Sequence, residues 1–349
     1  MKKNFDLMFF KPNRVWRCYK GGKLLNRLMG EESGEDSLFP ENWLGSITLA
    51  SNGEHQQSEI EGLSVLTDGE LFFEILQKNS MELLGESHGN LGVLCKFLDS
   101  AVRLPVQCHP DKEFAAKYCN SSYGKTESWF ILDTREVNGE KPYILFGFRE
   151  GVIKEQFSKA VAEQNIATMT SMMHKIEVKK GDAFFIPGKL PHAIGSGVLM
   201  LEVQEPTDLV IQPEEKIGDI TLSFHDMWGD LTPELGLDCF DYHGYSQAGL
   251  LDKLAIKGKK IDTAMYSLID DSLTDCFKVN KLEIAPENNY IFFNTKWHLA
   301  VVTSGHGTVK SNGKIYQLKH GDCFFIPCTH KELEFISTND SIEIYLITT

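Results

Sequence analysis

The sequence GDAFFIP at residues 181–187 recurs as GDCFFIP at residues 321–327, 140 residues further along the chain. Gly-Asp is typical of a tight turn, the four apolar residues after it predict a buried strand, and the proline ends strand pairing. Similar strand-like segments surround both copies. We therefore interpret the repeat as a β-barrel domain that occurs twice in the chain.

The segments outside the repeat also favour strands. Short runs rich in Val, Ile, Phe and Tyr alternate with Gly, Pro, Asn and Asp, a pattern typical of antiparallel sheets closed into barrels or sandwiches. The strands predicted in this way cover residues 71–76, 92–98, 127–133, 175–179, 182–186, 198–204, 279–284, 299–304, 314–318 and 342–347. Helical periodicity is confined to residues 111–118 and 154–174.

These patterns predict three parts of the chain. Residues 1–204 form the first domain, with a helical insertion around 111–174. Residues 205–276 are rich in Pro and Gly turns and read as a connecting segment. Residues 277–349 form the second domain.

Composition excludes several classes of protein. Of 349 residues, 42% are hydrophobic, and 49 acidic against 35 basic residues give a net charge of −14. Such an excess of negative charge repels nucleic acids and anionic lipid surfaces. No apolar run is long enough for a membrane span or a signal peptide, so we expect a cytoplasmic protein. The eight scattered cysteines are expected to be free thiols, and Cys323 and Cys328 to serve packing rather than redox or metal chemistry.

Four residues of the first domain form a candidate metal site. Gln107 and His109 are two positions apart, so on a strand their side chains point to one face. Glu127 opens a later strand, and His192 follows the repeated strand. Two imidazoles, a carboxylate and an amide oxygen suit Zn²⁺, and equally Fe²⁺ or Mn²⁺, with room for substrate or water.

The second domain lacks a matching pattern. Its counterpart strand carries Trp297 and His298 without a Gln-x-His motif, and its proline leads to His330. We therefore predict a second domain without a metal, in which His330 lies in a surface turn.

Four motifs in order carry a resemblance to a known family. QCHPD at 107–111, KTE at 125–127, PHAI at 191–194 and EVQ at 202–204 resemble motifs of the type I mannose-6-phosphate isomerases, also called phosphomannose isomerases. The resemblance extends over essentially the whole chain.

This resemblance implies a specific fold and activity. The fold is mainly β, with two cupin-type β-barrels (jelly rolls) and a helical insertion, and the activity is zinc-dependent interconversion of mannose 6-phosphate and fructose 6-phosphate. The implied partner is a sugar phosphate, with no nucleic acid or membrane. One zinc ion per chain is implied, with the ligands Gln107, His109, Glu127 and His192.

Further residues receive roles through the same resemblance. Aldose–ketose isomerisation moves a proton between neighbouring carbons, and Glu202 matches an active-site glutamate of the family. Its alternative role is to support the metal site. Lys125 is predicted to act with Glu202 in catalysis, and Lys112 and Gln212 are predicted to bind the substrate. Both lysines are candidates for holding substrate oxygens or phosphate, and the alternative for each is a solvated surface charge.

One position departs from the family pattern. Gln212 stands where the resemblance leads us to expect an active-site arginine, and an amide supplies neither the charge nor the fork of a guanidinium. Either another cation offsets the loss, or the substrate is not the usual sugar phosphate. The cations considered for this role are Arg103, Lys189 and Lys216.

Two other functions compete with the isomerase. Two histidines and one carboxylate also suit a cupin oxygenase with non-haem iron. A carbohydrate-binding or regulatory protein without turnover is the third hypothesis, and Gln212 is the feature that favours it.

Overall fold

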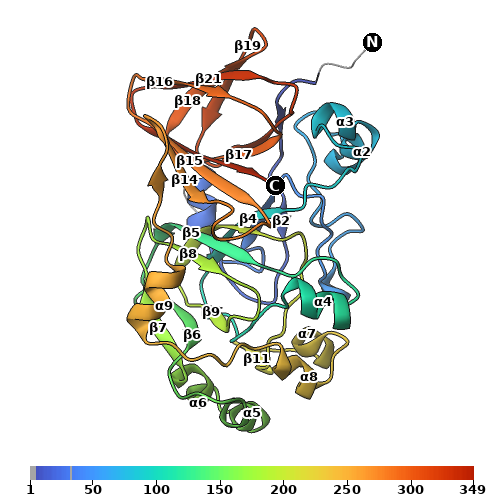
Figure 1. Ribbon diagram of the computed structural model, residues 1–349, viewed down its shortest axis with the longest axis vertical. Coiled ribbons are helices and arrows are strands. Elements are labelled where there is room, and N and C mark those ends of the chain that lie inside the picture. The colour runs from blue at the N-terminus through green and yellow to red at the C-terminus, as the bar shows by residue number, and fades with distance from the viewer. Residues whose placement is uncertain (1–4, 32–33) are drawn as a thin grey trace.

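Two groups of antiparallel strands build the protein (Figure 1). They are seen in a computed structural model that describes residues 5–31 and 34–349. The green strands of the first group lie in the middle of the molecule, and the orange and red strands of the second gather at one end. The predicted mainly-β class is confirmed, and the strands fit two jelly-roll barrels.

The first group combines a six-stranded and a three-stranded sheet. Their faces meet through aromatic packing, as where the rings of Phe146 and Phe184 lie 5.6 Å apart. The six-stranded sheet has the order β2 (Arg14–Val15), β3 (Glu41–Leu44), β4 (Leu94–Ser100), β10 (Val198–Gln204), β5 (Glu127–Thr134) and β8 (Ala183–Ile186). The three-stranded sheet has the order β7 (Met173–Glu177), β6 (Tyr143–Phe148) and β9 (His192–Ile194).

The second group combines a seven-stranded and a four-stranded sheet. Leu282 and Ile344 from the first of these share a buried core with Val309 and Phe335 from the second. The seven-stranded sheet has the order β1 (Met8–Phe9), β20 (Cys323–Ile326), β17 (His298–Ser304), β22 (Ile342–Thr348), β15 (Lys278–Ile284), β14 (Met265–Ile269) and β13 (Lys259–Lys260). The four-stranded sheet has the order β16 (Asn289–Phe293), β21 (Glu332–Ser337), β18 (His306–Ser311) and β19 (Lys314–Lys319).

Strands from outside residues 277–349 complete the second group. Met8 and Phe9 pair with Phe325 and Phe324 of β20, and β13 and β14 extend the same sheet beyond β15. The division at residues 204 and 276 stays a prediction. The chain passes from the first group to the second between β10 and β13, and β14 and β15 lie on either side of residue 276 in one sheet.

Short helices lie around the sheets. They are α1 (Lys23–Leu28), η1 (Gly53–His55), α2 (Phe72–Lys78), α3 (Ser80–Leu83), α4 (Lys112–Tyr118), α5 (Lys154–Ala162), α6 (Ile166–Ser171), α7 (Phe224–Trp228), α8 (Pro233–Asp238) and α9 (Gln247–Leu254), with the small hairpin β11 (Lys216–Ile217) and β12 (Ile220–Thr221) before α7. Within the part of the chain that the structure describes, no helix has the length and apolar character needed to cross a membrane.

Helical segments were predicted with mixed success. Residues 111–174 contain α4, α5 and α6, but β5 and β6 lie between them, so this stretch is not one helical insertion. The predicted strand at 71–76 is wrong, because these residues begin helix α2. Phe72 and Leu76 are buried while Phe73 is 37% exposed, which is the i, i+4 spacing of a helix face.

The repeated heptad forms the same turn twice. Gly181 and Gly321 both have positive φ angles, 92° and 86°. The following carboxylates of Asp182 and Asp322 each accept a hydrogen bond from a backbone N–H three residues earlier, at 2.9 Å. β8 then pairs with β5, and β20 pairs with β17. The repeat therefore places β5 and β17 in equivalent positions.

The surface turn predicted for His330 is wrong. Its side chain is fully buried, and its ring nitrogens lie 2.7 Å from Ser311 Oγ and 2.7 Å from the carbonyl oxygen of Phe5. These contacts tie the start of the described chain to the second barrel. The cysteines are free thiols as predicted, and Cys323 is buried among apolar residues.

Candidate active site

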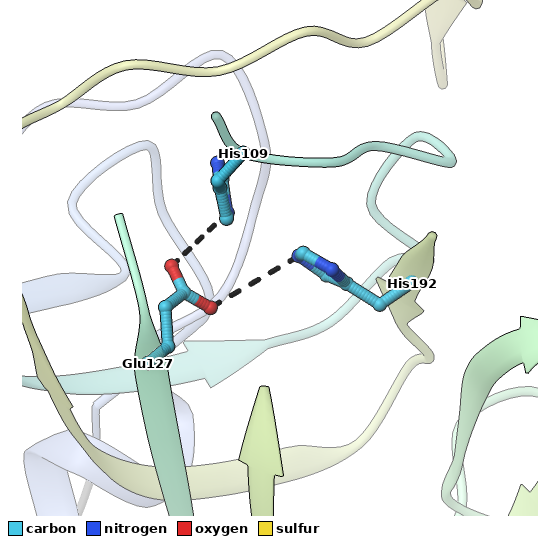
Figure 2. Close-up of side chains that lie close together, drawn as sticks. All are labelled: His109, Glu127 and His192. Carbon is cyan, nitrogen blue, oxygen red and sulfur yellow. Dashed lines mark ion pairs between the residues drawn. The ribbon is translucent and has the colours of Figure 1, made fainter. Parts of the chain in front are cut away.

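Three side chains meet at one point of the first barrel (Figure 2). The ligand atoms of His109, Glu127 and His192 all lie within 4.8 Å of one another, and all three residues are buried. His109 Nε2 is 3.0 Å from one carboxylate oxygen of Glu127, and His192 Nε2 is 4.0 Å from the other. Of the four residues predicted as metal ligands, the structure thus brings the ligand atoms of three close together, those of His109, Glu127 and His192.

The local fold positions the ligand atoms of these three side chains. Glu127 begins β5 and His192 begins β9, while His109 follows a bridge in which Gln107 pairs with His192. His109 Nδ1 lies 2.8 Å from the carbonyl oxygen of Leu209, and His192 Nδ1 lies 2.9 Å from that of Leu190. A carbonyl only accepts, so each Nδ1 carries the proton and each Nε2 presents a lone pair.

The site has the character of a metal centre. His192 Nε2 is buried and has no hydrogen-bond partner among the described residues. A buried polar atom without a partner is costly, and a bound cation would satisfy it. Burial, followed by the nearby His109, lowers the pKa of His192 to about 3, so the imidazole is neutral as a ligand must be. The residues present therefore fit a divalent ion.

Lys125 lies against the same atoms. Its Nζ is 3.1 Å from a carboxylate oxygen of Glu127 and 3.3 Å from His109 Nε2. Burial by itself favours the neutral acid, but the ammonium of Lys125 helps to hold the pKa of Glu127 well below its usual range. The ammonium therefore lies at the edge of the cluster of His109, Glu127 and His192.

Glu202 lies on β10 beside the cluster of His109, Glu127 and His192. It is 3% exposed, its carboxylate is 3.4 Å from Lys96 Nζ, and burial, followed by the charge of Glu127, raises its pKa to about 8. The strand pairing aligns Glu202 with Trp129, two residues after Glu127. The predicted proton-transfer residue therefore belongs to the same constellation as the ligands.

A chain of buried charges continues from Glu202, and sequence reasoning missed it. Lys96 also lies 3.7 Å from Glu41, and Arg17 lies 3.1 Å from Glu41 and 3.2 Å from Asp208. A lysine at the centre of the apolar run LCKFL at 94–98 was the available signal, since a charge in a buried strand needs a partner.

A cavity of about 680 Å³ opens beside these groups. Gln107, Lys125, Glu202 and Gln212 all line it. Lys112 is absent from its described lining and instead pairs with Asp275 at 3.1 Å on the surface, so the structure favours the solvated alternative for this lysine.

The cations considered as substitutes at position 212 are absent as well. Arg103 forms a two-pronged pair with Glu214, each contact 2.7 Å long, and neither Lys189 nor Lys216 is among the described residues of the lining. None of them therefore supplies the charge that Gln212 lacks.

The chain resembles known proteins in sequence and in fold. No family model matches it. It is 25% identical over 341 residues to the mannose-6-phosphate isomerase ManA of Bacillus subtilis, covering 92% of each chain. The crystal structure of the mannose 6-phosphate isomerase from Bacillus subtilis superposes with a TM-score of 0.74 at 19% identity, over 98% of this chain and 99% of that one.

A mannose 6-phosphate isomerase structure bound with zinc and yttrium has a TM-score of 0.72 at 17% identity and covers 99% of this chain and 100% of that one. These matches confirm the resemblance carried by the four motifs. The chain is therefore a relative of the mannose-6-phosphate isomerases and has the fold of the phosphomannose isomerases.

Proposed function

We propose that this chain is a metal-dependent aldose–ketose isomerase that interconverts mannose 6-phosphate and fructose 6-phosphate. The observation that carries the proposal is the convergence of His109, Glu127 and His192 beside the cavity that Glu202 lines. A relative named as a mannose-6-phosphate isomerase matches 92% of the chain, which supports this function over a cupin oxygenase or a binding protein.

The proposed metal ligands are Gln107, His109, Glu127 and His192. Gln107 is the fourth because its main chain pairs with that of His192, with N···O distances of 2.9 and 2.8 Å, and because it lines the cavity. Zinc is the proposed ion, since the protein with zinc in its structure shares this fold. When bound, such an ion polarises the carbonyl and hydroxyl oxygens of the reacting carbons.

The chain's own residues would move the proton. The carboxyl group of Glu202 lines the cavity from a buried strand and is proposed to carry the proton between carbons 1 and 2 of the sugar. The ammonium of Lys125 would donate hydrogen bonds to a substrate oxygen. Because Glu202 and Lys125 are both buried, the site also limits the access of water to the enediol intermediate of the isomerisation.

A direct assay tests the function. Protein loaded with zinc and freed of excess metal is incubated with mannose 6-phosphate, and fructose 6-phosphate is measured. We expect turnover that is lost with a chelator and restored by zinc. No turnover in folded protein with about one bound ion per chain would refute the proposed function.

A further inference from the structure

The cavity beside the metal site holds little free positive charge for a phosphate group. We propose that the protein also isomerises the unphosphorylated hexose, mannose to fructose, and that it has little preference for mannose 6-phosphate over mannose. This inference rests on the proposed isomerase chemistry and concerns the part of the sugar away from the reacting carbons.

Arg17 is the only guanidinium among the described residues that line the cavity, and it is already occupied. It lies 3.1 Å from Glu41 and 3.2 Å from Asp208, and its side chain is 10% exposed. A phosphate that took this cation would have to displace the buried carboxylate of Glu41 and the half-buried carboxylate of Asp208, which is costly.

The two lining lysines are committed in the same way. Lys96 lies between Glu202 and Glu41, at 3.4 and 3.7 Å. Lys125 lies 3.1 Å from Glu127. A metal bound to Glu127 would release Lys125, but its position beside the ligand atoms directs it to the reacting carbons. The 6-phosphate is at the opposite end of the six-carbon chain.

The wall of the cavity around α7 is negative. Six Asp and Glu residues line the cavity against the three Lys and Arg, counted over the described residues. Asp226 and Asp230 belong to this wall, and the neighbouring imidazole of His225 lies 3.8 Å from Asp230. Gln212 contributes a neutral amide that donates to the carbonyl oxygen of Asp226 at 2.9 Å. This wall suits a hydroxyl group better than a phosphate dianion.

Uncharged groups in the lining suit a sugar hydroxyl. Asn52 is 9% exposed, and its Nδ2 has no hydrogen-bond partner among the described residues. Trp16 and His55 stack with their rings 4.4 Å apart and also line the cavity. A neutral donor and an aromatic face are the means by which a protein binds an uncharged polar ligand.

The reaction itself does not involve the phosphate. The C2–H bond breaks and a C1–H bond forms, so that C1 is reduced from aldehyde to alcohol while C2 is oxidised from alcohol to ketone. The hydroxyl proton leaves the oxygen on C2 and the oxygen on C1 gains one. No outside oxidant or reductant is needed, and the free sugar carries every reacting atom.

The test compares two substrates in one preparation. kcat/KM is measured for mannose 6-phosphate and for mannose with the zinc-loaded full chain. One charge-assisted hydrogen bond to phosphate would give a preference of about tenfold to a hundredfold. We expect a ratio below about tenfold in the unmodified protein. Gln212→Arg should raise this ratio by at least about tenfold, because it adds a cation to the negative wall.

Gln212→Met is the matched control, since it has similar length, no charge and no amide. A ratio that rises in Gln212→Arg and not in Gln212→Met shows that the added charge, and not the loss of the amide, causes the change. A ratio above about tenfold in the unmodified protein would overturn this inference while leaving the proposed function intact. Absence of turnover with both sugars in metal-loaded protein would overturn the proposed function itself, and the inference with it.

Discussion

His298 gives the second barrel a measurable dependence on pH. It occupies the place that Glu127 has in the first barrel, since Glu127 pairs with Ile186 and His298 with Ile326, the last apolar residues of the two repeated strands. His298 is 6% exposed, and its Nδ1–H donates to Asn294 Oδ1 at 2.9 Å. Burial lowers the pKa of His298 to about 4, so it is neutral in the folded protein at pH 7.

The sign and size of the effect follow from this pKa. Unfolded histidine titrates near pH 6.5, so below that pH the unfolded chain binds a proton that the folded chain does not. The stability contributed by neutral His298 is therefore complete above pH 6.5 and is lost as the pH falls toward 4. The difference between a pKa of about 6.5 in the unfolded chain and about 4 in the folded chain contributes about 3 kcal/mol to the free energy of unfolding. About 2 kcal/mol of this is lost by pH 5.

The assay compares unmodified protein with His298→Asn, whose amide keeps a donor near Asn294 but does not titrate. Urea unfolding is followed by tryptophan fluorescence at pH 7 and pH 5, with a chelator throughout because metal ligands also titrate. Between pH 7 and pH 5 we expect the free energy of unfolding to fall by about 2 kcal/mol more in the unmodified protein than in the variant. An equal loss in both proteins would refute the assignment of a buried neutral His298.

Three further predictions concern the metal, the proton and the fold. Elemental analysis should find about one divalent ion per chain, and His109→Ala or His192→Ala should lose it; two ions, or unchanged content in either variant, would contradict the ligand assignment. Glu202→Gln should retain the metal and lose turnover by about 10²–10⁴-fold, whereas normal turnover would leave Glu202 only a supporting role. Asp99 Oδ2 accepts hydrogen bonds from the backbone N–H groups of Gly22, Leu24 and Leu25. Asp99→Ala removes this acceptor and should lower the free energy of unfolding by about 3 kcal/mol in denaturant titrations, and a change below about 1 kcal/mol would show that these hydrogen bonds are dispensable.

Local chemistry made several features readable in the sequence. The Gly-Asp turn before each repeated strand depends on one positive φ angle and one carboxylate that bonds three residues back, so seven residues suffice to specify it. Helix α4 was predicted from the helical periodicity of residues 111–118, and in the structure Asp111 caps it by accepting a hydrogen bond from the N–H of Phe114. The order of His109, Glu127 and His192 along the chain also indicated that these side chains would come together, as they do in the structure, while the four-ligand metal site stays a prediction.

Tertiary structure decided what depends on distant partners. The apolar run at 71–76 fits a strand or a helix, and only its packing buries Phe72 and Leu76 together as helix α2. His330 is buried because Phe5, 325 residues away, supplies its acceptor. The same holds for the charges of the active site. Lys112 directly follows the QCHPD motif and Lys96 lies outside all four motifs, but the folded sheet brings Lys96, and not Lys112, to Glu202. A salt bridge depends on distance in space, which sequence position does not encode.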